Sequence, residues 1–382
     1  MIEAVPAFVR SAAAFVLVLG VLVFVHELGH YLAARWRGVH VEAFSIGFGH
    51  AIASWSDRRG TVWKLCWLPL GGYVKLHGQE RPEDVTPEER ARWLPGRTFQ
   101  EKSVFSRAII VAAGPIANFL LAMVLFAALF AVIGRPMTLP VIGDVMPDGA
   151  AAAAGLLAGD RVEAIATATS PAVRIVNFED IQKIVSAHPA ERLEVTVQRH
   201  APDGDAKGAD PLLTLPVTTG TRDAGRVGVL GIRGGSVEYI KIDPASAVLA
   251  GVTQTWDVTA QTFAGVAQML TGSRGTEDLG GPLRIAQLSG QVAQLGLASL
   301  VSFIAVLSVN LGLINLFPIP VLDGGHLVFF LAEAIRGRPI PPRAQAAGFR
   351  AGMALLAGLF VFATWNDLSH LGIFRWMAAL IG

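Results

Sequence analysis

The chain has 382 residues, of which 52% are hydrophobic and only 16% are charged. Soluble globular domains carry roughly 25% charged residues, so this composition argues against a soluble protein and favours one embedded in a membrane. The net charge of +1 gives no electrostatic basis for binding nucleic acid, and the single cysteine, Cys66, excludes an intrachain disulfide.

Four apolar stretches are long enough, or nearly so, to form transmembrane helices, which need about 20 residues. They cover residues 7–30, 108–133, 295–317 and 349–364. The first is too long for the apolar core of a secretory signal peptide, and no small-residue cleavage site follows it, so we expect it to be retained. The sequence therefore predicts a polytopic α-helical membrane protein with about four transmembrane helices.

Lys and Arg residues gather in two of the loops that connect these stretches. One loop lies between the first and second stretches, and the other contains Arg336, Arg338 and Arg343. The positive-inside rule places such loops in the cytoplasm. We therefore expect both chain termini and residues 135–294 to lie on the outer side of the membrane.

The first cytoplasmic loop has the pattern of a β-hairpin sheet associated with the membrane. Residues 41–49 and 61–76 are rich in β-branched and aromatic side chains, and turn residues lie between them at 57–60. One interpretation is a structural sheet packed under the helices. The other is an edge strand that pairs with an extended substrate segment. The residues that would pair with substrate are Gly71, Gly72, Tyr73 and Val74.

Residues 135–235 are less apolar and alternate short strand patterns with one helical pattern. Residues 151–165 read A-x-x-A-G-L-x-x-G-D-x-V-x-x-I, which resembles a PDZ domain of the permuted kind found in bacterial proteases. PDZ domains bind peptide ends by adding a strand to a sheet edge. The resemblance implies a groove strand made of Val141, Ile142, Gly143, Asp144 and Val145. The alternative is a docked β-domain that binds no ligand.

These patterns divide the chain into four parts. Residues 1–134 are an N-terminal membrane part, 135–235 a single extracytoplasmic PDZ domain, 236–294 a peripheral segment and 295–382 a C-terminal membrane part. Within the peripheral segment, residues 243–284 have the pattern of one amphipathic helix lying on the outer membrane face.

The first apolar stretch ends in the motif His26-Glu27-Leu28-Gly29-His30. Two histidines at i and i+4 lie on one helix face and can bind a single Zn²⁺, while the glutamate beside the first can act as general base. The motif is short enough to arise by chance, so a third ligand is needed to support it. His26 and His30 are thus candidate ligands, and Glu27 is the candidate base.

A third ligand is available after the third apolar stretch, where two prolines interrupt the helix ahead of Asp323. Irregular backbone at membrane depth is tolerated only where it is buried in protein or lines a wet cavity, and an ionisable group there is a functional candidate by default. His26, His30 and Asp323 would leave the fourth position of a tetrahedral zinc ion open, as in catalytic sites.

Together these motifs resemble the site-2 protease family of intramembrane zinc metalloproteases. The matching features are HExxH in the first span, GPxxN at 114–118, a PDZ insertion, and N-x-x-P-x-P-x-L-D-G-G-H at 315–326. Within the family the chain is most similar to the bacterial regulator of sigma-E protease type. Enterobacterial proteins of that type have two tandem PDZ domains, whereas residues 135–235 have room for one.

The resemblance implies a zinc-dependent endopeptidase with one catalytic ion in the bacterial inner membrane. Both termini would be periplasmic and the active site would face the cytoplasmic side. The expected reaction is regulated intramembrane proteolysis: after a prior extracytoplasmic cut, the enzyme cleaves the transmembrane segment of a single-span protein. Such substrates include membrane-bound anti-sigma factors and signal-peptide remnants. The expected partners are this segment, a peptide or protein end at the PDZ domain, and the lipid bilayer.

Several roles remain open from the sequence. Asn315 is a candidate for hydrogen bonding the substrate backbone or oxyanion, or else it satisfies contacts between helices. His326 is either a donor behind the metal ligands or part of a local turn. Two other functions are alternatives to proteolysis. A zinc transporter would need ligands distributed through the later spans, and a PDZ-containing membrane scaffold would not need the complete set of ligands and base.

Overall fold

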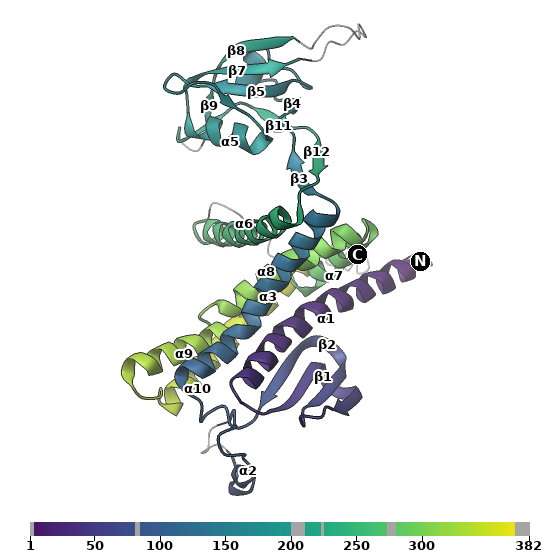
Figure 1. Ribbon diagram of the computed structural model, residues 1–382, viewed down its shortest axis with the longest axis vertical. Helices are drawn as coiled ribbons and strands as arrows, with labels where there is room; N and C mark the ends of the chain where they lie inside the picture. Colours follow the sequence, from purple (N-terminus) through teal and green to yellow (C-terminus); the bar gives the residue numbers. More distant parts are fainter. Residues whose placement is uncertain (1–3, 81–84, 200–210, 223–224, 273–279, 371–382) are drawn as a thin grey trace, which may run out of the picture. The chain divides into compact units, whose positions relative to one another are not determined.

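The computed structural model describes residues 4–80, 85–199, 211–222, 225–272 and 280–370. The chain divides into two compact units (Figure 1). Unit 1 combines Met1–Leu129 with Pro244–Gly382, and unit 2 is the intervening segment Phe130–Asp243. Unit 2 therefore extends a few residues beyond the range 135–235 expected for the central domain.

Unit 1 is built on four helices that are long and apolar enough to cross a membrane, which confirms the predicted polytopic helical protein. They are α1 (Ala4–Trp36), α3 (Val104–Val132), α8 (Leu297–Leu316) and α10 (Pro342–His370). Helix α1 continues past His30 because the following residues contain neither Gly nor Pro and include the strong helix formers Leu32 and Ala33. It ends just before Gly38, whose φ of 72° is left-handed.

The other described helices of unit 1 are α2 (Pro87–Ala91), α6 (Pro244–Leu270), α7 (Pro282–Gln294) and α9 (Asp323–Arg336). The prediction of one amphipathic helix over residues 243–284 is wrong. Gly272, with φ of 71°, follows the end of α6, and Pro282 begins α7. Helix α6 packs on α3 at Gly251, where an added Cβ would lie 2.6 Å from the carbonyl oxygen of Met123.

The strands β1 (Val41–Ser56) and β2 (Val62–Leu76) form an antiparallel sheet in unit 1. Phe44 pairs with both Val74 and Trp63, so the first half of β1 lies between the two halves of β2. Gly47, with φ of 84°, bends β1, and its second half pairs with β2 again through Trp55 and Trp63. The last residues of β2 consequently form one edge of the sheet.

Unit 2 is mainly β-structure around its own apolar core. A four-stranded sheet has the order β6-β5-β7-β8, and the other strands of the unit pair as β4 with β11, β3 with β12 and β9 with β10. Leu193, Val195 and Val197 alternate inward from β7 and pack against the buried face of α5. The element bounds are β3 (Arg135–Thr138), β4 (Ile142–Val145), α4 (Ala150–Ala153), β5 (Arg161–Ala166), β6 (Val173–Arg174), α5 (Phe178–Ala187), β7 (Arg192–Gln198), β8 (Leu212–Thr218), β9 (Gly220–Arg222), β10 (Val227–Val229), β11 (Ile232–Gly234) and β12 (Val237–Ile240).

Candidate metal centre and groove

The three candidate ligands predicted from the sequence come together in unit 1. The Nε2 atoms of His26 and His30 lie 3.2 Å and 3.4 Å from Oδ2 of Asp323, and 3.2 Å from each other. One ligand atom from each residue lies within 4.8 Å of the others. The side chains are only 11%, 13% and 18% exposed, so the cluster is largely shielded from solvent.

Helix geometry accounts for the two histidines, since residues four apart on α1 lie one turn apart on the same face. Asp323 is brought to them by a compact turn at the start of α9. Glycine is required at the next position, because a Cβ on Gly324 would collide with the carbonyl oxygen of Leu316. Val321 adopts φ of 111°, an unusual conformation for a β-branched residue, immediately before the helix.

The donor set suits a zinc ion. Two imidazole nitrogens and one carboxylate oxygen are common zinc ligands, and three protein ligands leave a fourth position for water or substrate. Among the residues that the structure describes, no group donates a hydrogen bond to the buried Oδ2 atom of Asp323. This buried acceptor faces two imidazole nitrogens, an arrangement that a bound cation would satisfy.

Glu27 lies beside the cluster and against the edge of the sheet. Its carboxylate lies near the backbone N–H of Val74. Gly72 allows this approach, because an added Cβ would lie 2.8 Å from Cγ1 of Val23 and 3.1 Å from Cγ of Glu27. The edge strand that the sequence suggested for substrate pairing therefore runs next to the candidate base.

The other two residues expected to pair with substrate lie on the same strand. Gly71 has φ of 91°, and a Cβ there would lie 2.8 Å from the ring of Phe48. Tyr73 pairs with Ser45 in the sheet and stacks on Phe48, with 6.2 Å between ring centroids. Both residues are half-buried in the fold.

Helix α3 forms the wall behind the two histidines. Nδ1 of His30 donates a hydrogen bond of 2.9 Å to the carbonyl oxygen of Ile110. An added Cβ on Gly114 would collide with Nε2 of His30 and lie 2.9 Å from Cε1 of His26. Nδ2 of Asn118 lies 3.2 Å from Nδ1 of His26. The sequence placed Asn118 in the GPxxN motif at 114–118 but assigned it no role at the metal site. Its polar side chain within an apolar span is a signal that could have done so.

Asn315 and His326 lie near the cluster in sequence, but neither belongs to the set of potential metal ligands. Asn315 is half-buried on the last turn of α8, and among the described residues its side chain makes no hydrogen bond. The ring of His326 packs on Phe349 with 5.3 Å between centroids, and burial lowers the pKa of His326 below its ordinary value. His326 is therefore packed in an aromatic contact rather than in the metal cluster.

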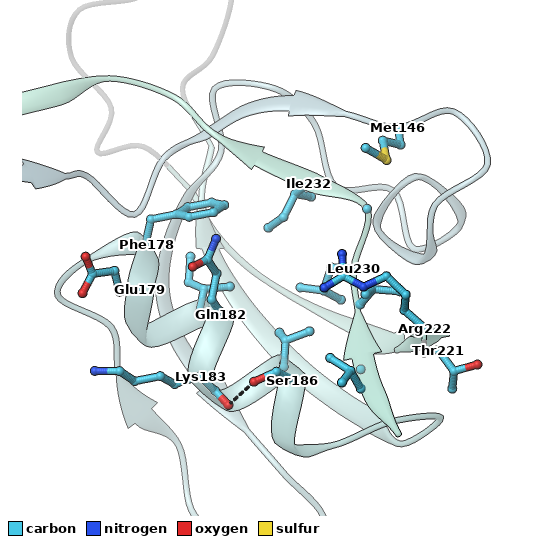
Figure 2. A pocket seen from close by; sticks show the side chains of 16 residues that line it. Met146, Phe178, Glu179, Gln182, Lys183, Ser186, Thr221, Arg222, Leu230 and Ile232 are labelled. Carbon is cyan, nitrogen blue, oxygen red and sulfur yellow. Dashed lines mark hydrogen bonds between the residues drawn. The ribbon is translucent and has the colours of Figure 1, made fainter. Parts of the chain in front are cut away.

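Unit 2 contains a separate groove of about 850 Å³. Figure 2 shows Gln182 and Ser186 on α5 facing Leu230 and Ile232 across it. The expected groove strand, Val141 to Val145, does not line the groove. Strand β4 pairs with β11, so β11 and the residues before it lie between β4 and α5. The wall opposite α5 is thus formed by residues 227–232.

The fold and the cluster define a polytopic membrane protein with a candidate zinc site between its helices. The model of Peptidase family M50 matches residues 14–359, and the chain therefore belongs to this family, the site-2 proteases.

Named relatives agree with this assignment. A protein of Agrobacterium fabrum that is named as a zinc metalloprotease is 44% identical over 94% of this chain and 95% of its own length. Metalloprotease MmpA of Caulobacter vibrioides is 37% identical over 98% of this chain and 99% of its own. Regulator of sigma-E protease RseP of Salmonella typhimurium is 32% identical over 94% and 99%. The chain is a zinc metalloendopeptidase.

Proposed function

We propose that this zinc endopeptidase cleaves the transmembrane segments of single-span proteins within the bilayer. Its zinc ligands would be His26, His30 and Asp323, and its general base Glu27. The observation that carries the proposal is the convergence of three ligand atoms within 4.8 Å, on a helix of transmembrane length and apolarity.

The residues around the cluster have distinct parts in this reaction. Zinc, when bound, supplies Lewis-acid chemistry that polarises the scissile carbonyl and acidifies water. Glu27 takes the proton of the attacking water and delivers it to the leaving amine. The backbone N–H of Val74 lies near the Glu27 carboxylate and would orient it for both transfers. Asn315, at the end of α8 and free of other hydrogen bonds among the described residues, is the proposed donor to the substrate backbone or oxyanion.

Substrate would bind as an extended strand along Gly71, Gly72, Tyr73 and Val74. A transmembrane helix must unwind before its peptide bond can be attacked, and each unsatisfied backbone group costs several kcal/mol in lipid. Among the described strands, this edge of β2 pairs with no further strand, and its backbone groups would reduce this cost. Substrates with helix-weakening residues in the membrane are therefore expected to be cleaved fastest.

The proposed location is the bacterial inner membrane, with both termini periplasmic and the metal centre toward the cytoplasm. Support comes from the Lys- and Arg-rich loops and from RseP, a relative named as a regulator of sigma-E protease. The enzyme would act after a prior extracytoplasmic cut. Membrane-bound anti-sigma factors and signal-peptide remnants are the proposed substrate classes.

Unit 2 is proposed to be a PDZ domain whose groove lies between α5 and residues 227–232. Strand β11 pairs with β4 on one side, and among the described strands it has no partner on the other. A peptide or protein end would add to this side as an extra strand. Titration of the full chain with peptides that carry a free or an amidated carboxyl terminus tests this proposal. Equal failure of both to bind would reject it.

The variant Glu27→Gln tests the proteolytic mechanism. Glutamine keeps the shape of the side chain but cannot accept the water proton, so zinc should stay bound while cleavage of a transmembrane substrate is lost. Zinc content and cleavage are measured on the same purified preparation. Undiminished cleavage would contradict the role of Glu27, and a wild-type protein without stoichiometric zinc would favour a membrane scaffold.

A further inference from the structure

Asn118 is a fully buried amide in the middle of a span, with 0% of its surface exposed. Its backbone carbonyl accepts a hydrogen bond of 2.8 Å from Ser308 on α8. Its side-chain atom Oδ1 is buried and, among the residues described, has no hydrogen-bond partner. An unpartnered buried polar atom is costly in an apolar helix, which suggests a functional partner for this side chain. The side chain lies beside His26.

The two imidazole rings meet α3 in the same way. Both Nε2 atoms face Asp323, and both Nδ1 atoms face back toward α3. The residues that meet them, Ile110 and Asn118, are eight positions apart with Gly114 midway, so all three lie on one face of the helix. Gly114 lacks the Cβ that would keep this face away from the rings.

For His30 the partner fixes the tautomer. A backbone carbonyl can only accept a hydrogen bond, so Nδ1 of His30 carries the proton and Nε2 keeps its lone pair toward Asp323. Metal-binding histidines commonly have their other ring nitrogen held in this way, which orients the ring and raises its basicity.

His26 needs an equivalent acceptor if it is to bind metal through Nε2. Nδ1 of His26 would then carry a proton. If Nδ2 of Asn118 faced it, the N–H groups of the two side chains would point at each other with no acceptor between them. A half-turn of the Asn118 amide about its Cβ–Cγ bond exchanges Nδ2 for Oδ1, the atom that has no partner among the described residues. We propose that Oδ1 of Asn118 accepts the Nδ1 proton of His26, and that Asn118 is the positioning residue for this ligand. The inference rests on the proposed zinc site.

Zinc affinity of the full-length protein, measured by competition with a chelator, tests the proposal. Replacing Asn118 with Leu keeps the size but removes the acceptor, and zinc affinity should fall about 10- to 100-fold. Asn118→Asp keeps an acceptor oxygen and should retain most of the affinity. The matched control Ser308→Ala removes a buried hydrogen bond from the same region without touching His26, and it should leave zinc affinity unchanged.

A folded Asn118→Leu protein with wild-type zinc affinity would overturn the inference. An equal loss of zinc affinity in the Asn118→Leu, Asn118→Asp and Ser308→Ala proteins would also overturn it. If the Leu variant does not fold, nitrogen-15 NMR of the His26 ring in the zinc-loaded wild type decides. A proton on Nδ1 is expected, and a proton on Nε2 would overturn the proposal. Failure of the zinc site itself is distinguishable, because the wild type would then bind no zinc or His26→Ala would not weaken it.

Discussion

The metal centre of unit 1 and the groove of unit 2 are built in opposite ways. The centre joins His26 and His30 of α1 to Asp323 of α9, nearly 300 residues away, in a small and largely buried cluster. The groove is wider, about 850 Å³, and most of its lining comes from α5 and residues 221–232. Ligand chemistry restricts which side chains can form the metal centre. The groove depends instead on which edge of a sheet is left unpaired.

This difference predicts that the two sites can be inactivated separately. Removing zinc with a chelator should abolish cleavage completely, and added zinc should restore it, because the Lewis acid is indispensable. Peptide binding to the groove should not change in the same sample. Loss of peptide binding on chelation would show that the two units are coupled.

A side chain that crowds the metal centre should cause the next largest loss, a loss of zinc affinity. In Gly114→Ala the new Cβ would collide with Nε2 of His30, so we expect zinc affinity to fall by at least about 100-fold, the upper range for a disturbed ligand shell. The matched control is Gly358→Ala in α10, where no atom lies within 4 Å of the added Cβ. Zinc content by mass spectrometry distinguishes them, and equal content in both proteins would contradict the geometry.

A buried ion pair connects α3 to the helix that carries Asp323. Arg107 and Glu333 lie 2.6 Å apart with side chains only 11% and 13% exposed. Glu333→Gln leaves the Arg107 charge unpaired, which should cost about 3–5 kcal/mol in unfolding free energy. The double variant Arg107→Met/Glu333→Gln should recover part of that loss in thermal unfolding. A single variant as stable as the wild type would show that this pair does not hold α9.

Blocking the groove should affect only unit 2. Ser186 is exposed on α5 and faces residues of the opposite wall (Figure 2), so Ser186→Trp should fill the groove and prevent peptide binding. Ser170→Trp, at an exposed position that does not line the groove, is the matched control. Neither change should alter zinc affinity. Peptide titration checks the pair, and unchanged binding in the first variant would place the peptide elsewhere.

The sequence was informative where the chemistry or the membrane leaves few options. Apolar length sufficed to predict the four candidate spans, and the HExxH spacing with Asp323 led to residues that the structure brings together. Asn118 was part of the GPxxN motif, but its role at the metal site was not predicted. Its relation to His26 depends on how α3 packs on α1 at Gly29, whose added Cβ would collide with the carbonyl oxygen of Ala113.

The residues that line the groove of unit 2 also differ from the strand expected from the sequence. A strand pattern at Val141 to Val145 does not reveal which neighbour occupies its edge, and in the structure that neighbour is β11. The break between α6 and α7 was missed because the amphipathic pattern outweighed the local effects of Gly272 and Pro282. Tertiary pairing and helix ends are thus the parts that the pattern alone did not determine.

The most direct test of the account is anomalous diffraction from the zinc-loaded protein at the zinc absorption edge. We expect a single strong peak about 2.0–2.2 Å from Nε2 of His26, Nε2 of His30 and a carboxylate oxygen of Asp323. A zinc peak elsewhere in the chain, or one that lacks any of these three residues as a ligand, would contradict it.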